Sequence, residues 1–183
     1  MRVEALIAVL EKAYSKQETS IFETQCLNEG LEWLKNLSPI TFQLRMKLGA
    51  FHFGVAPEDI NIALCEVRPP EVQEDGRVYY GEWRKGARDI KEGRGIMISQ
   101  DGNLREVWFK NNLMNGPGRY ITIDCEVFEG TYVDGYPQGL GTYVWPEPNV
   151  AKYVGDYKMG SRHGQGAKFY SNGNRYLGEW RND

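Results

Sequence analysis

Two histidines, His52 and His163, are the side chains of this sequence best suited to general acid–base chemistry. Neither has a nucleophile or a pair of carboxylates close to it in the sequence. His52 stands between two phenylalanines, which is typical of a packed histidine. We therefore predict no catalytic residues and no enzyme activity.

Three cysteines, Cys26, Cys65 and Cys125, are odd in number and widely spaced. Neither a disulfide framework nor a zinc site fits such spacing, which favours buried thiols in a reducing compartment. No apolar run approaches the ~20 residues of a membrane span, and the first ten residues lack the features of a signal peptide. The sequence predicts an intracellular, cytoplasmic protein without a metal.

Four Gly-x-Gly triplets resemble the start of phosphate-binding loops at first sight. None continues to the third glycine or to the Lys-Ser/Thr pair that such loops need, and a phosphate loop would not recur four times. We therefore expect no cofactor and no small-molecule substrate. The triplets are Gly93-Arg94-Gly95, Gly116-Pro117-Gly118, Gly139-Leu140-Gly141 and Gly164-Gln165-Gly166.

One basic cluster surrounds the first triplet, and it comprises Arg84, Lys85, Arg88, Lys91 and Arg94. It is either a solvated loop or a contact for an acidic partner surface or anionic lipid head groups. Asp89 and Glu92 dilute it, so membrane contact is expected to be weak or absent. Residues 1–75 carry a net charge of −5 and residues 76–183 a net charge of +2, which favours no nucleic-acid partner.

Glycine and aromatic residues divide the chain into two differently built parts. Of 21 glycines, 18 lie from Gly76 onward, together with 10 of the 11 tyrosines. Successive triplets in this part start 23, 23 and 25 residues apart, so the chain carries an internal repeat.

Upstream of the triplets lies a second repeated element, aromatic-x-Gly-x-aromatic, with period-two alternation. Both rings and the glycine must point to one face of a strand, and the glycine leaves room for a ring against bare backbone. Each unit is therefore predicted to be a β-hairpin, stable only when stacked on its neighbours. The predicted ladder residues are Tyr79, Gly81, Trp83, Phe128, Gly130, Tyr132, Tyr153, Gly155, Tyr157, Tyr176, Gly178 and Trp180.

The second repeat departs from this pattern. Counting back eleven residues from Gly116 puts Arg105 at the first aromatic position, Val107 at the glycine and Phe109 at the second aromatic. The first repeat has about three extra residues, and Pro146-Glu147-Pro148 lengthens the fourth turn. Turns are predicted at Asp101-Gly102-Asn103 and Asn172-Gly173-Asn174.

These elements resemble the MORN repeat, whose pattern is roughly Tyr-x-Gly-x-Trp-x-x-Gly-x-x-x-Gly-x-Gly-x-Tyr. Val133-Asp134-Gly135 and Lys158-Met159-Gly160 match the first turn of the family, and His163 stands where the family commonly has histidine. The resemblance implies an elongated, twisted antiparallel sheet of hairpins. It also implies a scaffold, docking module or membrane-proximal adaptor, because the repeat has no chemistry of its own.

The front of the chain is predicted to be helical. Apolar stripes favour helices at residues 3–14 and 22–37, and Ser38-Pro39 supplies an N-cap and N1 proline for a third, with Ile40, Leu44, Leu48 and Phe51 as its stripe. A short fourth helix is expected from Pro57, with Ile60 and Leu64 apolar.

The predicted fold class is α+β. It consists of a helical segment at 1–67, a linker at 68–77 and the array at 78–183, with about four repeats and a half repeat. The helices either cap the open first hairpin or present an apolar face to a partner. At the other end, the half repeat is predicted to leave an unpaired docking edge at Arg175, Tyr176, Leu177 and Trp180, the alternative being a frayed terminus.

Three functions remain open at this point. The first is a structural or scaffolding subunit that binds other proteins in a larger assembly, such as the ciliary radial-spoke and cytoskeletal complexes in which the resembled family is found. The second is a membrane-contact adaptor that binds anionic lipid, and the third is the regulatory front end of an enzyme. The first is favoured, because the sequence contains no membrane anchor and no catalytic domain.

Overall fold

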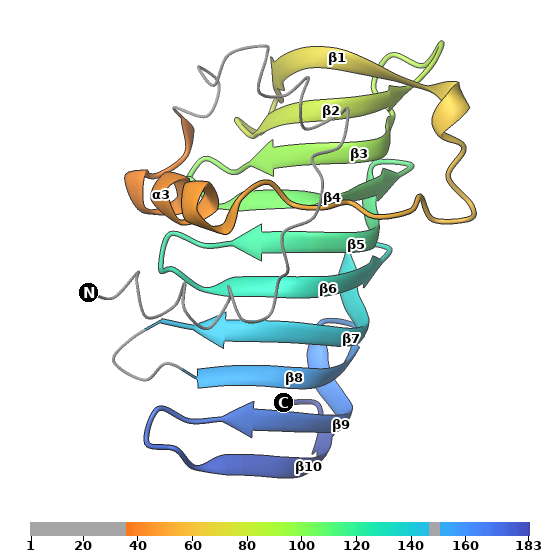
Figure 1. Cartoon of the computed structure of the whole chain (residues 1–183). Helices are drawn as coiled ribbons and strands as arrows, with labels where there is room; N and C mark the ends of the chain where they lie inside the picture. Colours follow the sequence, from red (N-terminus) through yellow and green to blue (C-terminus); the bar gives the residue numbers. More distant parts are fainter. Residues whose placement is uncertain (1–35, 147–150) are drawn as a thin grey trace.

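The computed structural model describes residues 36–146 and 151–183, in which ten antiparallel strands form one sheet (Figure 1). The strands follow one another in the sheet in chain order, so every connection is a hairpin. This is the predicted stack of hairpins, and helix α3 precedes it in the described part of the chain. The strands are β1 (Cys65–Val72), β2 (Val78–Arg84), β3 (Lys91–Ile98), β4 (Leu104–Lys110), β5 (Leu113–Ile121), β6 (Val127–Val133), β7 (Tyr136–Trp145), β8 (Ala151–Lys158), β9 (Ser161–Phe169) and β10 (Arg175–Arg181).

A row of glycines crosses the sheet from β2 to β10 and sets the register of the hairpins. Each glycine pairs with the next across the ladder, and Val107 of β4 is the one exception in the row. Because no side chain projects from these positions, rings from the same face can lie directly on the backbone. The row is Gly81, Gly95, Val107, Gly118, Gly130, Gly141, Gly155, Gly166 and Gly178.

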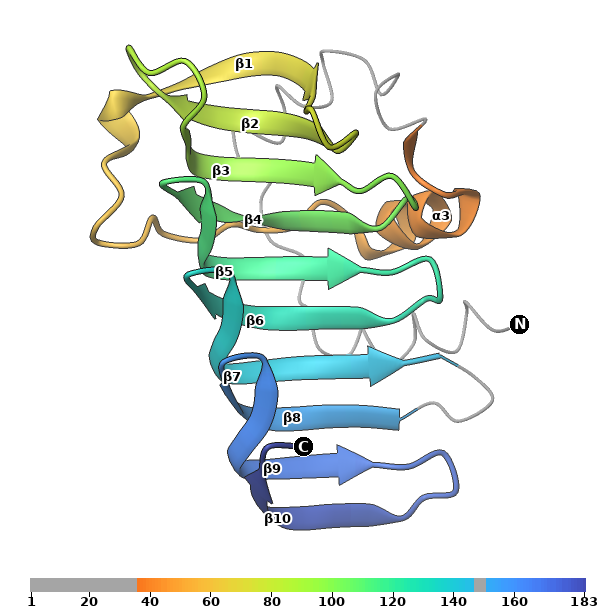
Figure 2. The same cartoon turned by 180° about the vertical axis from the view of Figure 1, so that it is seen from behind.

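The sheet bends just beyond this row. In β2, β4, β6 and β8 the pairing register shifts within two residues after the glycine position, which is where a β-bulge bends and twists a strand. Rings four residues apart on a straight strand would lie about 13 Å apart. The ring centroids of Tyr79 and Trp83 are only 5.0 Å apart, so the bend is toward the rings. The strand ends away from the helix accordingly turn out of the plane of the sheet (Figure 2).

The turns at these bent ends are short. Asp134 and Gly135, and likewise Met159 and Gly160, both have positive φ, as a two-residue type I′ hairpin requires. At the opposite ends, the predicted turns at Gly102 and Gly173 are present.

One face of the sheet, here called the helix face, carries the apolar core. It is defined by Val78, Tyr80, Ile96, Ile98, Leu104, Trp108, Ile121, Val127 and Val144. Helix α3 (Pro39–Leu48) packs here through Leu44, and the segment that follows it contributes Phe53 and Ile60. The indole Nε1 of Trp108 donates to the carbonyl of Phe53 at 2.7 Å, which ties the segment to β4.

Helix α3 begins as predicted, because Ser38 accepts a hydrogen bond from the Thr41 amide at 3.0 Å and Pro39 follows the cap. Its inner side differs from the predicted stripe. Ile40 is 46% exposed, while Thr41 and Arg45 are buried beside Leu44. The helices predicted at residues 3–14 and 22–37 lie outside the described residues, except for the last residues of the second.

The helix predicted from Pro57 is wrong. Only a single 3₁₀ turn, η2 (Ile62–Leu64), forms there, capped by the side chain of Asn61. Ile60 is buried on the helix face whereas Leu64 is 58% exposed, so the two apolar residues share no side of a helix.

The linker predicted at 68–77 also needs correction, because residues 68–72 belong to β1. This strand pairs with β2 through Cys65 to Val72, with a register shift between Arg68 and Glu71 at the two prolines. The first hairpin is therefore covered along its edge by a strand. Helix α3 covers the face of the sheet near β4 and β5 instead (Figure 1).

Candidate interaction surface

The face opposite the helix carries stacked aromatic residues and is here called the ring face. Its buried members are Tyr79, Trp83, Met97, Val107, Phe109, Phe128, Tyr132, Tyr153 and Tyr157. The structure places all twelve predicted ladder residues in register along this face.

The ring pairs within the ladder repeat one edge-to-face geometry. Within a strand, the centroids of Tyr153 and Tyr157 lie 5.4 Å apart at 90°, and those of Tyr176 and Trp180 lie 5.2 Å apart at 87°. Between repeats, the first ring of one unit meets the second ring of the next, as with Tyr153 and Trp180 at 5.0 Å. Aromatic pairs prefer this arrangement, and the repeat propagates it along the sheet.

The leading tyrosines add a repeated hydrogen bond. The hydroxyls of Tyr79, Tyr153 and Tyr176 each donate to the carbonyl three residues further on, at 3.0–3.1 Å. Burial raises the pKa of Tyr79 well above its usual value. The phenol of Tyr79 is therefore a structural donor and is unsuited to acid–base chemistry at neutral pH.

The degenerate second repeat keeps the stack continuous. Val107 occupies the glycine row and pairs with a glycine on both sides, which makes room for its side chain. Phe109 takes the second ring position and meets Tyr79 at 5.2 Å. Arg105 replaces the first ring, and its guanidinium lies 4.2 Å from the centroid of Tyr120.

A buried ionic network fastens α3 to the sheet on the helix face. Glu106 is fully buried and pairs with Arg45 at 3.0 Å and with Arg119. Arg119 also donates to the carbonyl of Gly49 at 2.7 Å, beyond the end of the helix. Burial alone would raise the pKa of Glu106, but the two guanidinium groups outweigh it and lower that pKa.

The predicted basic cluster is largely engaged within the molecule. Arg84 pairs with Glu92 at 2.9 Å and Arg94 with Glu82 at 2.5 Å. Lys85 donates to the carbonyl of Ala63, and Lys91 donates to Gln73 and lies 5.1 Å from the ring centroids of Tyr79 and Trp83. Arg88 is almost fully exposed beside Asp89. The five cations therefore do not form one open basic patch.

The histidines and thiols have separate surroundings. The Nδ1 of His52 accepts from the amide of Gly54 at 3.2 Å, while His163 lies on β9. Burial raises the pKa of the Cys65 thiol to about 11, with Glu82 and Glu92 adding to the shift. Among the described residues, no three histidine, cysteine or acidic side chains are grouped to hold a metal ion.

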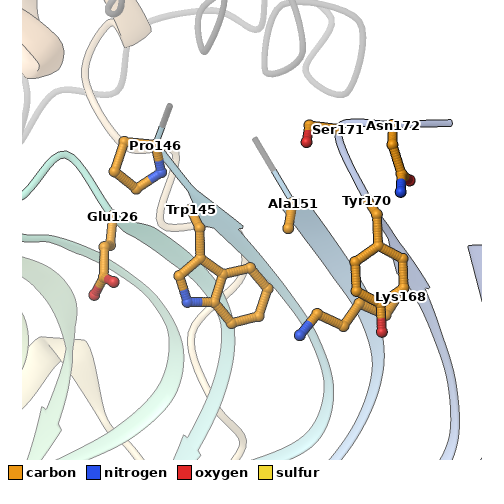
Figure 3. Close-up of a pocket in the computed structure, with 8 residues that line it drawn as sticks. All are labelled: Glu126, Trp145, Pro146, Ala151, Lys168, Tyr170, Ser171 and Asn172. Carbon is orange, nitrogen blue, oxygen red and sulfur yellow. The ribbon is translucent and has the colours of Figure 1, made fainter. Parts of the chain in front are cut away.

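A groove of about 630 Å³ lies near the hairpin turns of β7, β8 and β9, and the ring face forms much of its wall (Figure 3). It is lined by Glu126, Trp145, Pro146, Ala151, Lys168, Tyr170, Ser171 and Asn172. The ammonium of Lys168 lies 5.1 Å from the ring centroid of Trp145 and 5.2 Å from that of Tyr170. The carboxylate of Glu126 accepts a hydrogen bond from the hydroxyl of Tyr143 at 2.5 Å.

Strand β10 contains the residues of the predicted docking edge. It pairs with β9 from Arg175 to Arg181, and within the described chain no strand pairs with its other side. Tyr176 is 45% exposed and Leu177 is 62% exposed. The side chains of Tyr176 and Trp180 lie on the ring face, while Arg175 and Leu177 lie on the other.

A family model for the MORN repeat matches residues 79–104, 109–124, 128–147 and 153–175. The matched stretches lie between the start of β2 and the start of β10, and the chain is a MORN-repeat protein. In the described part of the chain, no helix has the length and apolar character needed to cross a bilayer.

Sequence reasoning missed several residues that shape the ring face. Tyr120, Tyr143 and Lys168 lie in one cross-strand row with the leading rings of the ladder. If the glycines of neighbouring strands are set opposite each other in the sequence, the residues two positions from each glycine fall into this row. The engagement of Arg45 with Glu106 is a contact between residues 61 positions apart, for which the sequence carries no signal.

Proposed function

We propose that this protein is a non-catalytic scaffold whose MORN array binds other protein subunits of a larger assembly. The observation that carries the proposal is the half-buried row of aromatic and basic side chains on the concave ring face, beside the groove at Trp145. Tryptophan, tyrosine and arginine are the residue types that most often dominate the energy of protein interfaces.

The charged groups inside the molecule support a binding role over a catalytic one. Glu106 and Arg119 are engaged in the ion pairs that hold α3. The tyrosines of the ladder are engaged in packing and in hydrogen bonds to the backbone. No small-molecule substrate, nucleic acid or cofactor is part of the proposal. We further propose that the assembly is cytoplasmic and is a ciliary, radial-spoke-like or cytoskeletal complex, a proposal that the membership of the MORN family supports.

Co-purification of the tagged full-length chain from a ciliated cell lysate, after mild crosslinking, tests this proposal. We expect the chain to elute from size exclusion well above its 21.0 kDa mass, together with a fixed set of proteins. Elution at the monomer position without a reproducible partner would overturn it.

A membrane-contact role is the second candidate, and flotation with phosphatidylserine vesicles separates it from the first. The engagement of Arg84, Lys91 and Arg94 within the molecule leaves little free basic charge, so we expect weak or no flotation. If tight flotation persists after charge reversal of the five clustered cations, the protein binds lipid through another part of its surface.

A further inference from the structure

We propose that the ring face binds an acidic peptide segment of a partner protein along one stripe of aromatic and basic side chains. This aromatic–cation stripe comprises Arg105, Tyr120, Tyr143, Trp145, Lys168 and Tyr170. This inference rests on the proposed scaffold function and adds to it the chemical class of the partner.

Strand register places the two ends of the stripe in one cross-strand row. Arg105 pairs with Tyr120, Tyr120 with Phe128, and the row continues through Tyr143 and Tyr153 to Lys168. Arg105 lies on β4 and Lys168 on β9, which is five strand spacings, or about 24 Å. A helical segment of about 16 residues, or a shorter extended one, would reach from one cation to the other.

The charges of the stripe favour an acidic occupant. In the described chain, neither Arg105 nor Lys168 forms an ion pair, although nine other basic side chains do. Glu126 is the acid that lines the groove, and it accepts the hydroxyl hydrogen of Tyr143. Arg105 and Lys168 are thus both still able to pair with carboxylates of a partner.

Aromatic rings hold these cations in place before a partner binds. Arg105 lies over Tyr120, and Lys168 lies between Trp145 and Tyr170 (Figure 3). A side chain that is already oriented loses less conformational entropy on binding than a free one. The rings beside them supply apolar contact area, as between Tyr143 and Trp145, whose centroids lie 4.4 Å apart. The expected partner segment therefore carries both carboxylates and apolar side chains.

The shape of the ring face favours a peptide over a membrane. The strand ends bend toward the rings, so the stripe lies on a concave surface, and all its residues except Tyr170 are half-buried. A flat bilayer reaches the bottom of such a surface poorly, whereas a single peptide segment fits along it.

The test is selection of random 16-residue peptides, displayed on phage, against the full-length protein. We expect enriched peptides to be acidic with interspersed apolar residues, and their synthetic versions to bind more weakly at higher salt. Charge reversal of Arg105 and Lys168 together, R105E/K168E, is expected to reduce their affinity about tenfold or more, as for paired charges at an interface. If the charge-reversed protein does not fold, R105Q/K168Q takes its place. This variant keeps much of each side-chain stem and is also expected to reduce the affinity.

The matched control is K47E/K158E, which makes the same change in net charge at exposed residues of α3 and of the end of β8. It is expected to bind the selected peptides like the parent protein. The proposal is overturned if the enriched peptides are neutral, basic or proline-rich, if none is enriched, or if both double variants bind alike. It is also overturned if phosphatidylserine vesicles bind through Arg105 and Lys168. If protein partners still co-purify after such a result, the scaffold function holds, but the stripe is not its binding site.

Discussion

At the level of β4 and β5, the helix face carries the paired residues Glu106 and Arg119, whereas the same level of β8 and β9 carries Val154 and Ala167. The ring faces of the two regions keep edge-to-face ring pairs of nearly the same separation, although Arg105 and Val107 of β4 stand where β8 has Tyr153 and Gly155. The ring contacts are therefore kept in both regions, while the helix face changes from an ion pair to two small apolar residues.

The two ends of the sheet differ in a related way. β1 carries Pro69 and Pro70 beside a register shift, and both features oppose the addition of another strand. β10 has neither a proline nor a register shift in its pairing with β9, and its Tyr176 and Leu177 are exposed. The second end is the one whose edge is suited to accept a strand.

The largest effect is expected from Glu106→Gln, which removes the charge shared by Arg45 and Arg119. Breaking a buried ion pair from one side typically costs about 3–5 kcal/mol, and Glu129 near Arg119 favours the lower end. Urea unfolding of the full-length protein measures the loss. Glu179→Gln, an exposed change on β10, is the control and should stay within about 0.5 kcal/mol of the parent. Equal stabilities of the two variants would refute the role of the buried Glu106 ion pairs in holding α3 on the sheet.

The next effect concerns the glycine row in the regular region. A Cβ at Gly155 would lie 2.5 Å from the Cα of Gly166 and would also overlap the hydroxyl of Tyr153. We expect Gly155→Val to destabilise the protein by about 1–3 kcal/mol through overpacking. Val107 occupies the row in β4, where Arg105 replaces the leading ring, so this valine does not contradict the expected effect at Gly155.

Chemical denaturation with near-ultraviolet circular dichroism measures this effect, and Thr131→Val on an exposed position of β6 is the control. An unchanged aromatic signal together with parent-like stability of Gly155→Val would argue against close packing of rings on the glycine row.

A pH dependence should distinguish the two regions more finely. The folded-state pKa of Glu106 is lowered from 4.5, so its stabilising contribution is complete above about pH 4.5 and is lost as pH falls through the folded-state pKa. The stability difference between the parent and Glu106→Gln should therefore shrink below about pH 4.5. Melting temperatures at pH 7 and at pH 3 to 4.5 test this, and a constant difference would contradict it.

The smallest effect on stability is expected from deletion of residues 175–183. Apart from Trp180, which is half-buried against Tyr153, the side chains of the strand are exposed at the end of the sheet, so β1–β9 should stay folded. If β10 is a docking edge, recruitment into the parent complex should fall even though the remaining array is intact. Unchanged co-purification of partners would mean that β10 only covers β9.

The sequence by itself determined the hairpin stack, its period and the residues of the ladder. Local spacing is sufficient for these features, because alternation puts two rings and a glycine on one face of a strand, and glycine then admits the rings. The cap of α3 was predictable for the same reason, since Ser38 and Pro39 act on the turn that directly follows them.

Only the tertiary structure decided what covers the sheet. Three features depend on contacts between distant residues: the burial of Arg45 with Glu106, the place of β1 at the edge of β2, and the segment after Pro57, which forms a 3₁₀ turn in place of the predicted helix. The stripe from Arg105 to Lys168 likewise exists only once five strand pairings are in register. Such contacts leave no local pattern, because their energy comes from burial and pairing that neither partner shows alone.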